Sequence, residues 1–444
     1  LANASLRNAD LQNAHLWSTD LTGADLTGAL INGAEFYSTG LTFGQIASTA
    51  SYQNRNLVGV GFSNVNFTGA NLSNQKLWGA SFENVTLTSA TFAGANLWDT
   101  QVMWSDLQNA DFSGANLKHA NISYANLTNA SLRNANLRNA SLWEVDLTGA
   151  DFTGAIIDGM SFGRVEGFTR EQLYSTASYE SGNLARIGFN TQNFNEGDFR
   201  NQNLAGSTFM SVSLHNSTLD GANLWKAIIQ WGEFNYSSLE GVNLEGAAIV
   251  GSDLLGVSLR NANLRNAYIL VSNLAGADLT GAIINGATFN DNSGLSSLIY
   301  NTASYQNFDL SGVSFENIDF TNGDFHNQNL ENASFAYSNL GGANFEGANI
   351  RAARFWDVSG FTKEQIYTTR SYTAKDLRGV TFGFINLSDA DFSDQNLAGS
   401  TFYNTSLADA ILDGANIRSA TFWGVTGFTQ GQLYSTQSYQ NKDL

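Results

Sequence analysis

The chain has 444 residues and a formal net charge of −18, and it contains neither Cys nor Pro. This composition excludes disulfides, thiolate metal sites and thiol catalysis, and the scattered single Asp and Glu residues predict a solvated, mildly acidic surface. No run of about 18 apolar residues is present and Leu1 begins no signal-peptide pattern, so we expect no membrane span.

From the first residues onward, large apolar residues recur every five positions. Leu6, Leu11 and Leu16 begin the series, and a small residue, usually Ala, stands two positions before most of its members. A period of five fits neither the 3.6 residues of a helical turn nor the alternation of a strand, so the backbone must turn a corner every five residues. We expect the large apolar and small residues to point inward and the other three positions to face water.

A recurring phrase, such as GFTREQLYSTASYESGNL at 167–184, divides this series into blocks. The repeats fill residues 1–36, 57–162, 184–289, 310–355 and 377–422. The phrase occupies residues 40–57, 167–184, 294–310, 360–377 and 427–444. Composition hardly changes along the chain, so we expect one continuous repeat domain over residues 1–444.

Every copy of the phrase begins with Gly, and four copies continue with a Thr that is followed three residues later by Gln. This is the spacing of a capping box, in which the two side chains satisfy the first amides of a helix. The copy at 294–310 lacks the box and is expected to be looser. We expect a helix of one or two turns in the other four copies, with N-caps at Thr42, Thr169, Thr362 and Thr429.

The second half of the phrase resumes the period of five. Tyr179 lies five residues before Leu184, Tyr174 lies five before Tyr179, and Ala177 takes the small-residue position. This spacing predicts that both tyrosines occupy core positions. It also predicts that the inserted residues lie between Phe162 and Tyr174.

A glutamine replaces the inward small residue of one repeat after each of the first four phrases. Because a buried amide needs hydrogen-bond partners, we expect these side chains to bond backbone groups that the inserted residues leave unpaired, with a chemical role as the alternative. The four residues are Gln75, Gln202, Gln328 and Gln395.

The repeat A(D/N)LXX, as in ANLRNASL at 135–142, resembles the pentapeptide-repeat family across essentially the whole chain. The resemblance implies an all-β solenoid, a right-handed quadrilateral β-helix in which four pentapeptides form one square coil. It implies about 20 such coils here, with short helical insertions projecting from one edge. The phrase, together with NQNLAGSTF at 201–209, is similar to secreted pentapeptide-repeat proteins of planctomycete-type bacteria, which implies an extracellular or cell-surface location.

Seven tryptophans directly follow a central apolar residue and are therefore expected to face outward. They are candidates for packing under the inserted helices, for lateral protein contact or for polysaccharide stacking. Counting in coils places them in two columns, one with Trp17, Trp143, Trp356 and Trp423 and the other with Trp78, Trp98 and Trp225.

The sequence contains no catalytic or metal-binding motif that we recognise. The four histidines fall in different columns, so they form no paired metal site. The HExxH, Walker and GxSxG motifs are missing, and a straight column offers no cleft for catalysis. We therefore expect no enzyme activity, no metal and no cofactor.

Two functions of different classes fit this sequence. The first is a non-enzymatic structural protein that self-associates through end-to-end and lateral contacts into an extracellular fibre or surface layer. This expectation rests on the length, the lack of any recognised site, the uncapped ends and the regular projections. The second is a binding module for a protein or a polysaccharide.

A mimic of duplex DNA that inhibits topoisomerases is a less favoured form of the binding module. Duplex DNA carries roughly 60 charges over the expected length of this solenoid. The net charge of −18 is far smaller. The acidic surface also leads us to expect no nucleic-acid partner.

Overall fold

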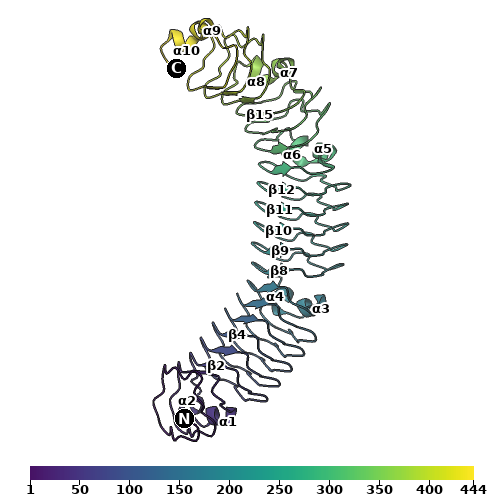
Figure 1. Ribbon diagram of the computed structural model, residues 1–444. Helices are drawn as coiled ribbons and strands as arrows, with labels where there is room; N and C mark the ends of the chain where they lie inside the picture. Colours follow the sequence, from purple (N-terminus) through teal and green to yellow (C-terminus); the bar gives the residue numbers. More distant parts are fainter. The chain divides into compact units, whose positions relative to one another are not determined.

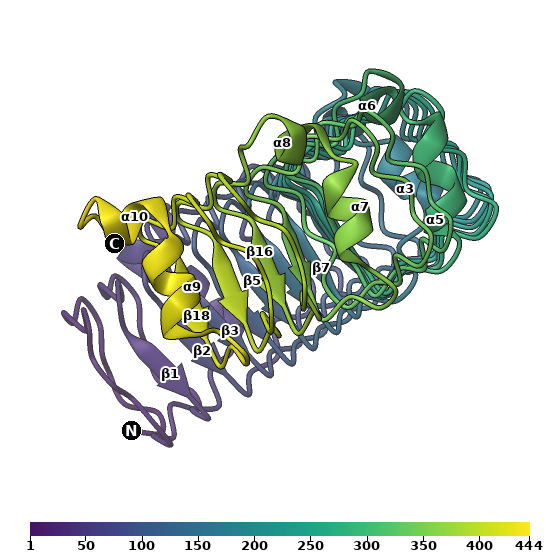
Figure 2. The ribbon, with the colours of Figure 1, turned by 90° about the horizontal axis from the view of Figure 1, so that it is seen from above.

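The computed structural model describes all 444 residues, which form two compact units of the same architecture. Unit 1 contains Leu1–Gly197 and Asn201–Leu214, and unit 2 contains Asp198–Arg200 and His215–Leu444. Each unit is a parallel β-solenoid, and its short strands lie in a row along one side of the coils (Figures 1 and 2). The fold class predicted from the repeat is therefore confirmed.

One face of each coil carries the strands, and we call it the strand face. Successive strands pair in parallel, and Phe62 lies beside Phe82, so one regular coil contains 20 residues. The other faces are joined by single bridges at the same offset, such as that between Asn66 and Thr86. Outside the phrases, the corners of a coil are thus held to the next coil by backbone hydrogen bonds.

The strands are three residues long in both units. In unit 1 they are β1 (Glu35–Tyr37), β2 (Gly61–Ser63), β3 (Ser81–Glu83), β4 (Gln101–Met103), β5 (Asn121–Ser123), β6 (Ser141–Trp143), β7 (Ser161–Gly163), β8 (Gly188–Asn190) and β9 (Thr208–Met210). In unit 2 they are β10 (Ile228–Gln230), β11 (Ala248–Val250), β12 (Tyr268–Leu270), β13 (Thr288–Asn290), β14 (Ser314–Glu316), β15 (Arg354–Trp356), β16 (Thr381–Gly383), β17 (Thr401–Tyr403) and β18 (Thr421–Trp423).

The interior is filled by the residues that recur every five positions. Phe82, Leu87 and Phe92 are at most 1% exposed, and Ala80 and Ala90, two positions before the phenylalanines, are also buried. Burial of one Leu or Phe side chain contributes about 1.5–3 kcal/mol, so these stacked layers supply the main stabilisation of the coils. The inward orientation predicted from the period of five is confirmed.

The helices all lie within the recurring phrase. None of them is long and apolar enough to cross a membrane. In unit 1 they are α1 (Phe43–Ala47), α2 (Ala50–Gln53), α3 (Arg170–Tyr174) and α4 (Ala177–Glu180). In unit 2 they are α5 (Leu295–Leu298), the 3-10 turn η1 (Ile299–Asn301), α6 (Ala303–Gln306), α7 (Lys363–Tyr367), α8 (Arg370–Thr373), α9 (Gln430–Ser435) and α10 (Gln437–Gln440).

The first helix of four phrases begins with a capping box. Thr42, Thr169 and Thr429 accept the amide of the Gln three residues later, and the Gln side chain accepts the amide of the Thr. In α7 the Gln365 side chain accepts the Thr362 amide at 2.7 Å. The phrase without the box begins α5 after Gly294, which has a left-handed conformation and gives no side-chain cap.

The phrase joins the core at a different residue from the one that the spacing predicts. Leu173 is fully buried, whereas Tyr174 and Tyr179 are half-buried and stack on each other with ring centroids 4.4 Å apart. The turn of α3 is the reason, because it directs Leu173 inward and Tyr174 along the flank. The prediction of two tyrosine core positions is wrong, and most of the inserted residues lie between Leu173 and Leu184.

Candidate functional site

The glutamine of each capping box also fastens its helix to the preceding coil. The Gln172 side-chain amide donates to the carbonyl groups of Leu147 and Ala150, at 3.0 and 2.8 Å. Gln45, Gln365 and Gln432 form the same pair of bonds in their own phrases. The Thr–Gln pairs therefore anchor the insertions to the solenoid.

A serine of the phrase supplies a hydrogen bond that the interrupted ladder lacks. Ser178 Oγ accepts the backbone N–H of Ile157 at 2.9 Å, and sequence reasoning missed this role. The signal was available, because every phrase has Ser directly before its last Tyr. The equivalent pairs are Ser51 with Ile31, Ser304 with Ile284, Ser371 with Ile350 and Ser438 with Ile417.

The four glutamines at inward positions lie on the following coil and bond the end of the phrase. Gln202 Nε2 donates to the Tyr179 carbonyl at 3.0 Å. Gln75, Gln328 and Gln395 donate in the same way to the carbonyls of Tyr52, Tyr305 and Tyr372. Each of these four phrases is thus also bonded to the coil that follows it, while Oε1 of each glutamine is buried without a hydrogen-bond partner. The supporting role of the four glutamines stays a prediction.

The first tryptophan column lies on the strand face. Trp143, Trp356 and Trp423 each end a strand, and Trp17 stacks on Tyr37, the last residue of β1, with ring centroids 5.9 Å apart. Trp17 and Trp423 are 59% and 63% exposed. Unit 1 contributes Trp17 and Trp143 to this position, and unit 2 contributes Trp356 and Trp423.

The second tryptophan column, Trp78, Trp98 and Trp225, lies on the face that precedes the strand face. Trp78 and Trp98 occupy adjacent coils of unit 1 with ring centroids 5.2 Å apart. Trp225 belongs to unit 2, and the Lys226 ammonium lies over its ring at 4.4 Å. All three are exposed, and the Trp98 ring also meets the His119 ring edge-on, with ring centroids 6.4 Å apart.

Three tryptophans lie against a glycine of the next coil: Trp143, Trp356 and, over Gly251, Trp231. A Cβ atom on Gly163 would come within 2.2 Å of the Trp143 ring, and one on Gly383 within 2.6 Å of the Trp356 ring. The missing side chain lets each indole cover the backbone of the neighbouring strand. In this position the Trp356 ring extends past Gly383 and contacts Tyr403, which lies two coils further on.

Four aromatic side chains form a continuous stack on the strand face over β15–β18, and we call it the aromatic ladder. Its members are Trp356, Phe384, Tyr403 and Trp423. Tyr403 has ring centroids at 4.8 Å to Trp356, 5.4 Å to Phe384 and 6.4 Å to Trp423. Phe384 and Trp423 remain exposed, so the ladder is a surface and not part of the core.

A second apolar surface covers the strand face over β10–β12. We call it the apolar patch, and it consists of Ile228, Trp231, Val250, Tyr268, Leu270 and Val271. Ile228 and Tyr268 are 44% and 51% exposed, while Trp231 and Val271 are both 59% exposed. No charged residue occurs in the three strands or at the corner residue after each of them. Patches of this kind mark interaction sites on soluble proteins.

The sequence analysis missed the apolar patch because it considered tryptophans only at one position. Trp231 and Val271 stand at corners of the coil with positive φ, where Asn and Gly are the usual residues. Ile228 and Tyr268 stand directly before the central isoleucine, at a position that is polar in most repeats. Apolar residues at these positions were the available signal.

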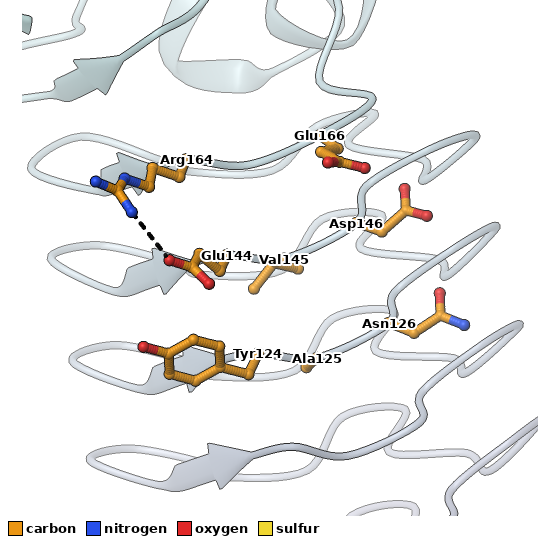
Figure 3. A pocket seen from close by; sticks show the side chains of 8 residues that line it. All are labelled: Tyr124, Ala125, Asn126, Glu144, Val145, Asp146, Arg164 and Glu166. Atoms are coloured by element: carbon orange, nitrogen blue, oxygen red, sulfur yellow. Dashed lines mark hydrogen bonds and ion pairs between the residues drawn. The ribbon is translucent and has the colours of Figure 1, made fainter.

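Unit 1 carries a polar hollow on and beside its strand face (Figure 3). Tyr124, Glu144 and Arg164 lie on successive coils, and Arg164 contacts Glu144 at 3.4 Å. Tyr124 also stacks on Trp104 with ring centroids 5.7 Å apart. An aromatic pair thus borders a row of charges in this unit.

The Asp146 carboxylate of this hollow is a hydrogen-bond acceptor. The hydroxyl and the amide of Thr148 donate to Asp146 and hold the pKa of that carboxyl below its ordinary value, so Asp146 is ionised at neutral pH. Glu166 lines the hollow on the next coil. A general acid needs the opposite shift, towards a raised pKa. No group of three or more His, Asp or Glu side chains is arranged to hold a metal ion.

Comparison with protein-family models identifies eight copies of pentapeptide repeats in the chain. The matches cover residues 1–37, 56–97, 104–134, 130–165, 234–269, 306–335, 329–359 and 385–424. Comparison with curated protein sequences finds no match.

Several solved structures are similar to this chain. HetL from the cyanobacterium Nostoc sp. strain PCC 7120, a pentapeptide repeat protein involved in heterocyst differentiation regulation, is 24% identical over 55% of this chain and 97% of its own, with a TM-score of 0.29. QnrB1, a plasmid-mediated fluoroquinolone resistance protein, is 22% identical over 47% of this chain and 88% of its own, with a TM-score of 0.24. A pentapeptide repeat protein from the Arabidopsis thaliana thylakoid lumen is 25% identical over 25% of this chain and 73% of its own, with a TM-score of 0.15.

Proposed function

The chain belongs to the pentapeptide repeat family, and from this premise we propose that it is a binding scaffold whose strand face binds another polypeptide chain. The observation that carries the proposal is the strand face of unit 2, where the apolar patch and the aromatic ladder are exposed. Apolar surface that a partner covers is removed from water, at about 25 cal/mol per Å². The inserted helices, in contrast, already use their glutamine and serine side chains for hydrogen bonds to the neighbouring coils.

The chemistry of the strand face favours a polypeptide over a polysaccharide. Ile228 and Val271 are aliphatic, and such side chains fit other apolar side chains better than they fit the hydroxyl groups of a sugar. A pyranose ring stacks on a free aromatic face. In the ladder the rings of Tyr403 and Trp423 are nearly parallel, at 3°, and stack on each other. The net charge of −18 disfavours nucleic acid.

The fibre or surface layer, the extracellular location and the binding of polysaccharide stay predictions from the sequence. A polypeptide-binding strand face is compatible with each of the first two. In such an assembly, a polypeptide-binding strand face would place the lateral contacts at the aromatic ladder or at the apolar patch.

Site-specific photo-crosslinking tests this function. A benzoylphenylalanine residue replaces Trp231 or Phe384 in the full chain, which is expressed in cells of its natural host. The matched control replaces Trp225, which is 43% exposed but lies off the strand face. We expect protease-sensitive adducts with a polypeptide at positions 231 and 384 and much weaker labelling at 225.

The same experiment defines what contradicts the proposal. Equal labelling at all three positions would mean that the strand face has no preferred partner. Adducts that carbohydrate-degrading enzymes remove and proteases leave intact would assign the face to a polysaccharide instead.

A further inference from the structure

Two tyrosines of the recurring phrase lie against each other on the flank of the solenoid. In the copy at 360–377 they are Tyr367, the last residue of α7, and Tyr372 in α8, and we call these two residues the tyrosine pair. Their ring centroids are 4.8 Å apart, and the ring planes are tilted by 44°. Both side chains are half-buried. The two rings are therefore in contact and keep partial access to solvent.

The next coil holds the two hydroxyl groups of the tyrosine pair together. The Tyr367 hydroxyl accepts the Asp391 amide at 2.7 Å, and the Tyr372 hydroxyl donates to the Asp391 carbonyl at 2.8 Å. Because both hydroxyls meet one residue, the carbon atoms ortho to them lie at the same end of the two rings. The tyrosines of the preceding phrase bond Asp324 in the same way.

This pairing recurs in four of the five phrases. The other three pairs, with their ring-centroid distances, are Tyr174 and Tyr179 at 4.4 Å, Tyr300 and Tyr305 at 5.0 Å, and Tyr434 and Tyr439 at 4.4 Å. The first phrase has Ala47 in place of the first tyrosine, and there Tyr52 meets the Phe43 ring instead. The two helices of a phrase thus form without a second phenol.

We propose that the tyrosine pair is a site of oxidative cross-linking, at which a peroxide and a one-electron oxidant of the haem class join the two rings by a carbon–carbon bond. This inference goes beyond the proposed function and does not depend on it. The chain contains no Cys, so disulfides cannot link its elements covalently. A dityrosine bond at this position fastens α7 to α8 without a thiol.

The reaction balances in atoms and electrons. Each phenol loses the hydrogen of its hydroxyl group as one electron and one proton, and the two phenoxyl radicals join through their ortho carbons. The hydrogen on each joined carbon then moves to the neighbouring oxygen, which restores both hydroxyl groups. One molecule of hydrogen peroxide takes up the two electrons and two protons and becomes two molecules of water.

The bonds to Asp391 favour this product. In dityrosine both hydroxyl groups stand next to the new bond, so both can stay on the backbone of Asp391. Two reactants that are held in position couple faster than two that meet by chance. Tyr268 is more exposed, at 51%, but its neighbours in the ladder are Ala248 and Thr288, so it has no phenol beside it.

Mass spectrometry after trypsin digestion detects the bond directly, because cleavage after Arg370 places the two tyrosines on separate peptides, 364–370 and 371–375. The purified full chain is treated at low concentration with hydrogen peroxide and a small haem peptide, which reaches half-buried groups. We expect the two peptides to be joined, with a mass lower by two hydrogen atoms than the sum of their masses.

Two comparisons show whether the fold directs the coupling. Tyr372→Phe keeps the ring but removes one phenol, so we expect the joined peptides to be lost. Tyr403→Phe changes a tyrosine of the aromatic ladder and is the matched control, which keeps them. The same oxidation of the wild-type chain in denaturant is expected to give about tenfold less of the joined peptides, because the rings are no longer held in position.

Three outcomes overturn the inference. The first is a folded wild-type chain that gives no joined peptides or only links between molecules. The second is an equal yield in the folded and the unfolded chain, which would mean that closeness in sequence alone directs the coupling. The third is a cross-link that persists in Tyr372→Phe. Circular dichroism checks that the variants are folded, and the comparison of folded with unfolded wild type needs no variant.

Discussion

At the scale of single residues, the arrangement of the aromatic rings on the strand face depends on glycines of the neighbouring coil. Gly383 leaves the space into which the Trp356 ring extends, and this position brings the indole to Tyr403 on the second coil beyond. Gly163 plays the same part under Trp143 in unit 1. The aromatic ladder therefore depends on Gly383 as well as on its four aromatic residues.

Replacement of Gly383 by Ala tests this dependence. The new Cβ would lie 2.6 Å from the Trp356 ring, so the indole must move and the contact with Tyr403 is lost. We expect the near-ultraviolet circular dichroism of the aromatic side chains to change while the far-ultraviolet spectrum stays the same. Thr381→Ala on the same strand is the control, and an unchanged aromatic signal in Gly383→Ala would contradict the account.

The buried amide of Gln202 provides a second prediction. Gln202→Ala restores the small residue that is usual at this position but leaves the Tyr179 carbonyl without its donor. We expect a loss of about 1–3 kcal/mol in the stability of the coil, seen as faster amide hydrogen exchange in α4. Gln108→Ala, whose side chain is more exposed, is the control and should change little. A variant as stable as the wild type would mean that Gln202 has another role.

The carboxylate of Asp25 predicts a pH dependence. The Thr27 hydroxyl, the Thr27 amide and Arg7 donate to Asp25 and lower its pKa to about 2, so the folded state favours the ionised form. The resulting stabilisation is present above the ordinary pKa of 3.8 and is lost as the pH falls towards 2. We expect a carboxyl titration by NMR to have its midpoint near 2, and Thr27→Val to raise it. A midpoint of 3.8 in both proteins would be inconsistent with these bonds.

At the scale of elements, the recurring phrase shows which features local sequence rules predict and which they do not. The capping-box spacing identified the four Thr positions and the helices that start after them, because the box is a local pattern of four residues. The period of five, applied to the same phrase, placed Tyr174 in the core. It could not detect that Leu173 lies there, because the direction of a side chain in α3 depends on how the helix meets the preceding coil.

The bonds of Gln172 predict how strongly α3 is held. Gln172→Ala removes one bond to the Thr169 amide and two to the carbonyls of Leu147 and Ala150. At about 0.5–1.5 kcal/mol for each bond, we expect α3 to open more easily by about 2–3 kcal/mol, measured as loss of hydrogen-exchange protection over Arg170–Tyr174.

Glu171→Ala serves as the control for this change, because Glu171 is exposed and in the same helix. Equal protection of α3 in the two variants would show that the helix is held by Leu173 alone. The phrase without a capping box, at α5, offers an internal comparison within the same molecule.

At the scale of the whole molecule, the period of five was enough to predict the β-solenoid, because each inward residue is defined by its spacing. The outward residues are different. Their exposure depends on which face of the coil they occupy and on their neighbours 20 residues away. Apolar residues at usually polar positions signal the apolar patch in the sequence, but Ile228, Trp231, Tyr268 and Val271 become one surface only after the strands are placed in register.

Hydroxyl-radical footprinting tests the central claim, that the strand face is the binding surface, most directly. Oxidation of Trp231 and Trp423 is measured in cells of the natural host and in the dilute purified chain, with Trp78 and Trp225 as exposed tryptophans off this face. The account predicts that Trp231, Trp423 or both are protected in cells while the other two are oxidised equally in both samples. Equal oxidation of all four tryptophans in the two samples would contradict it.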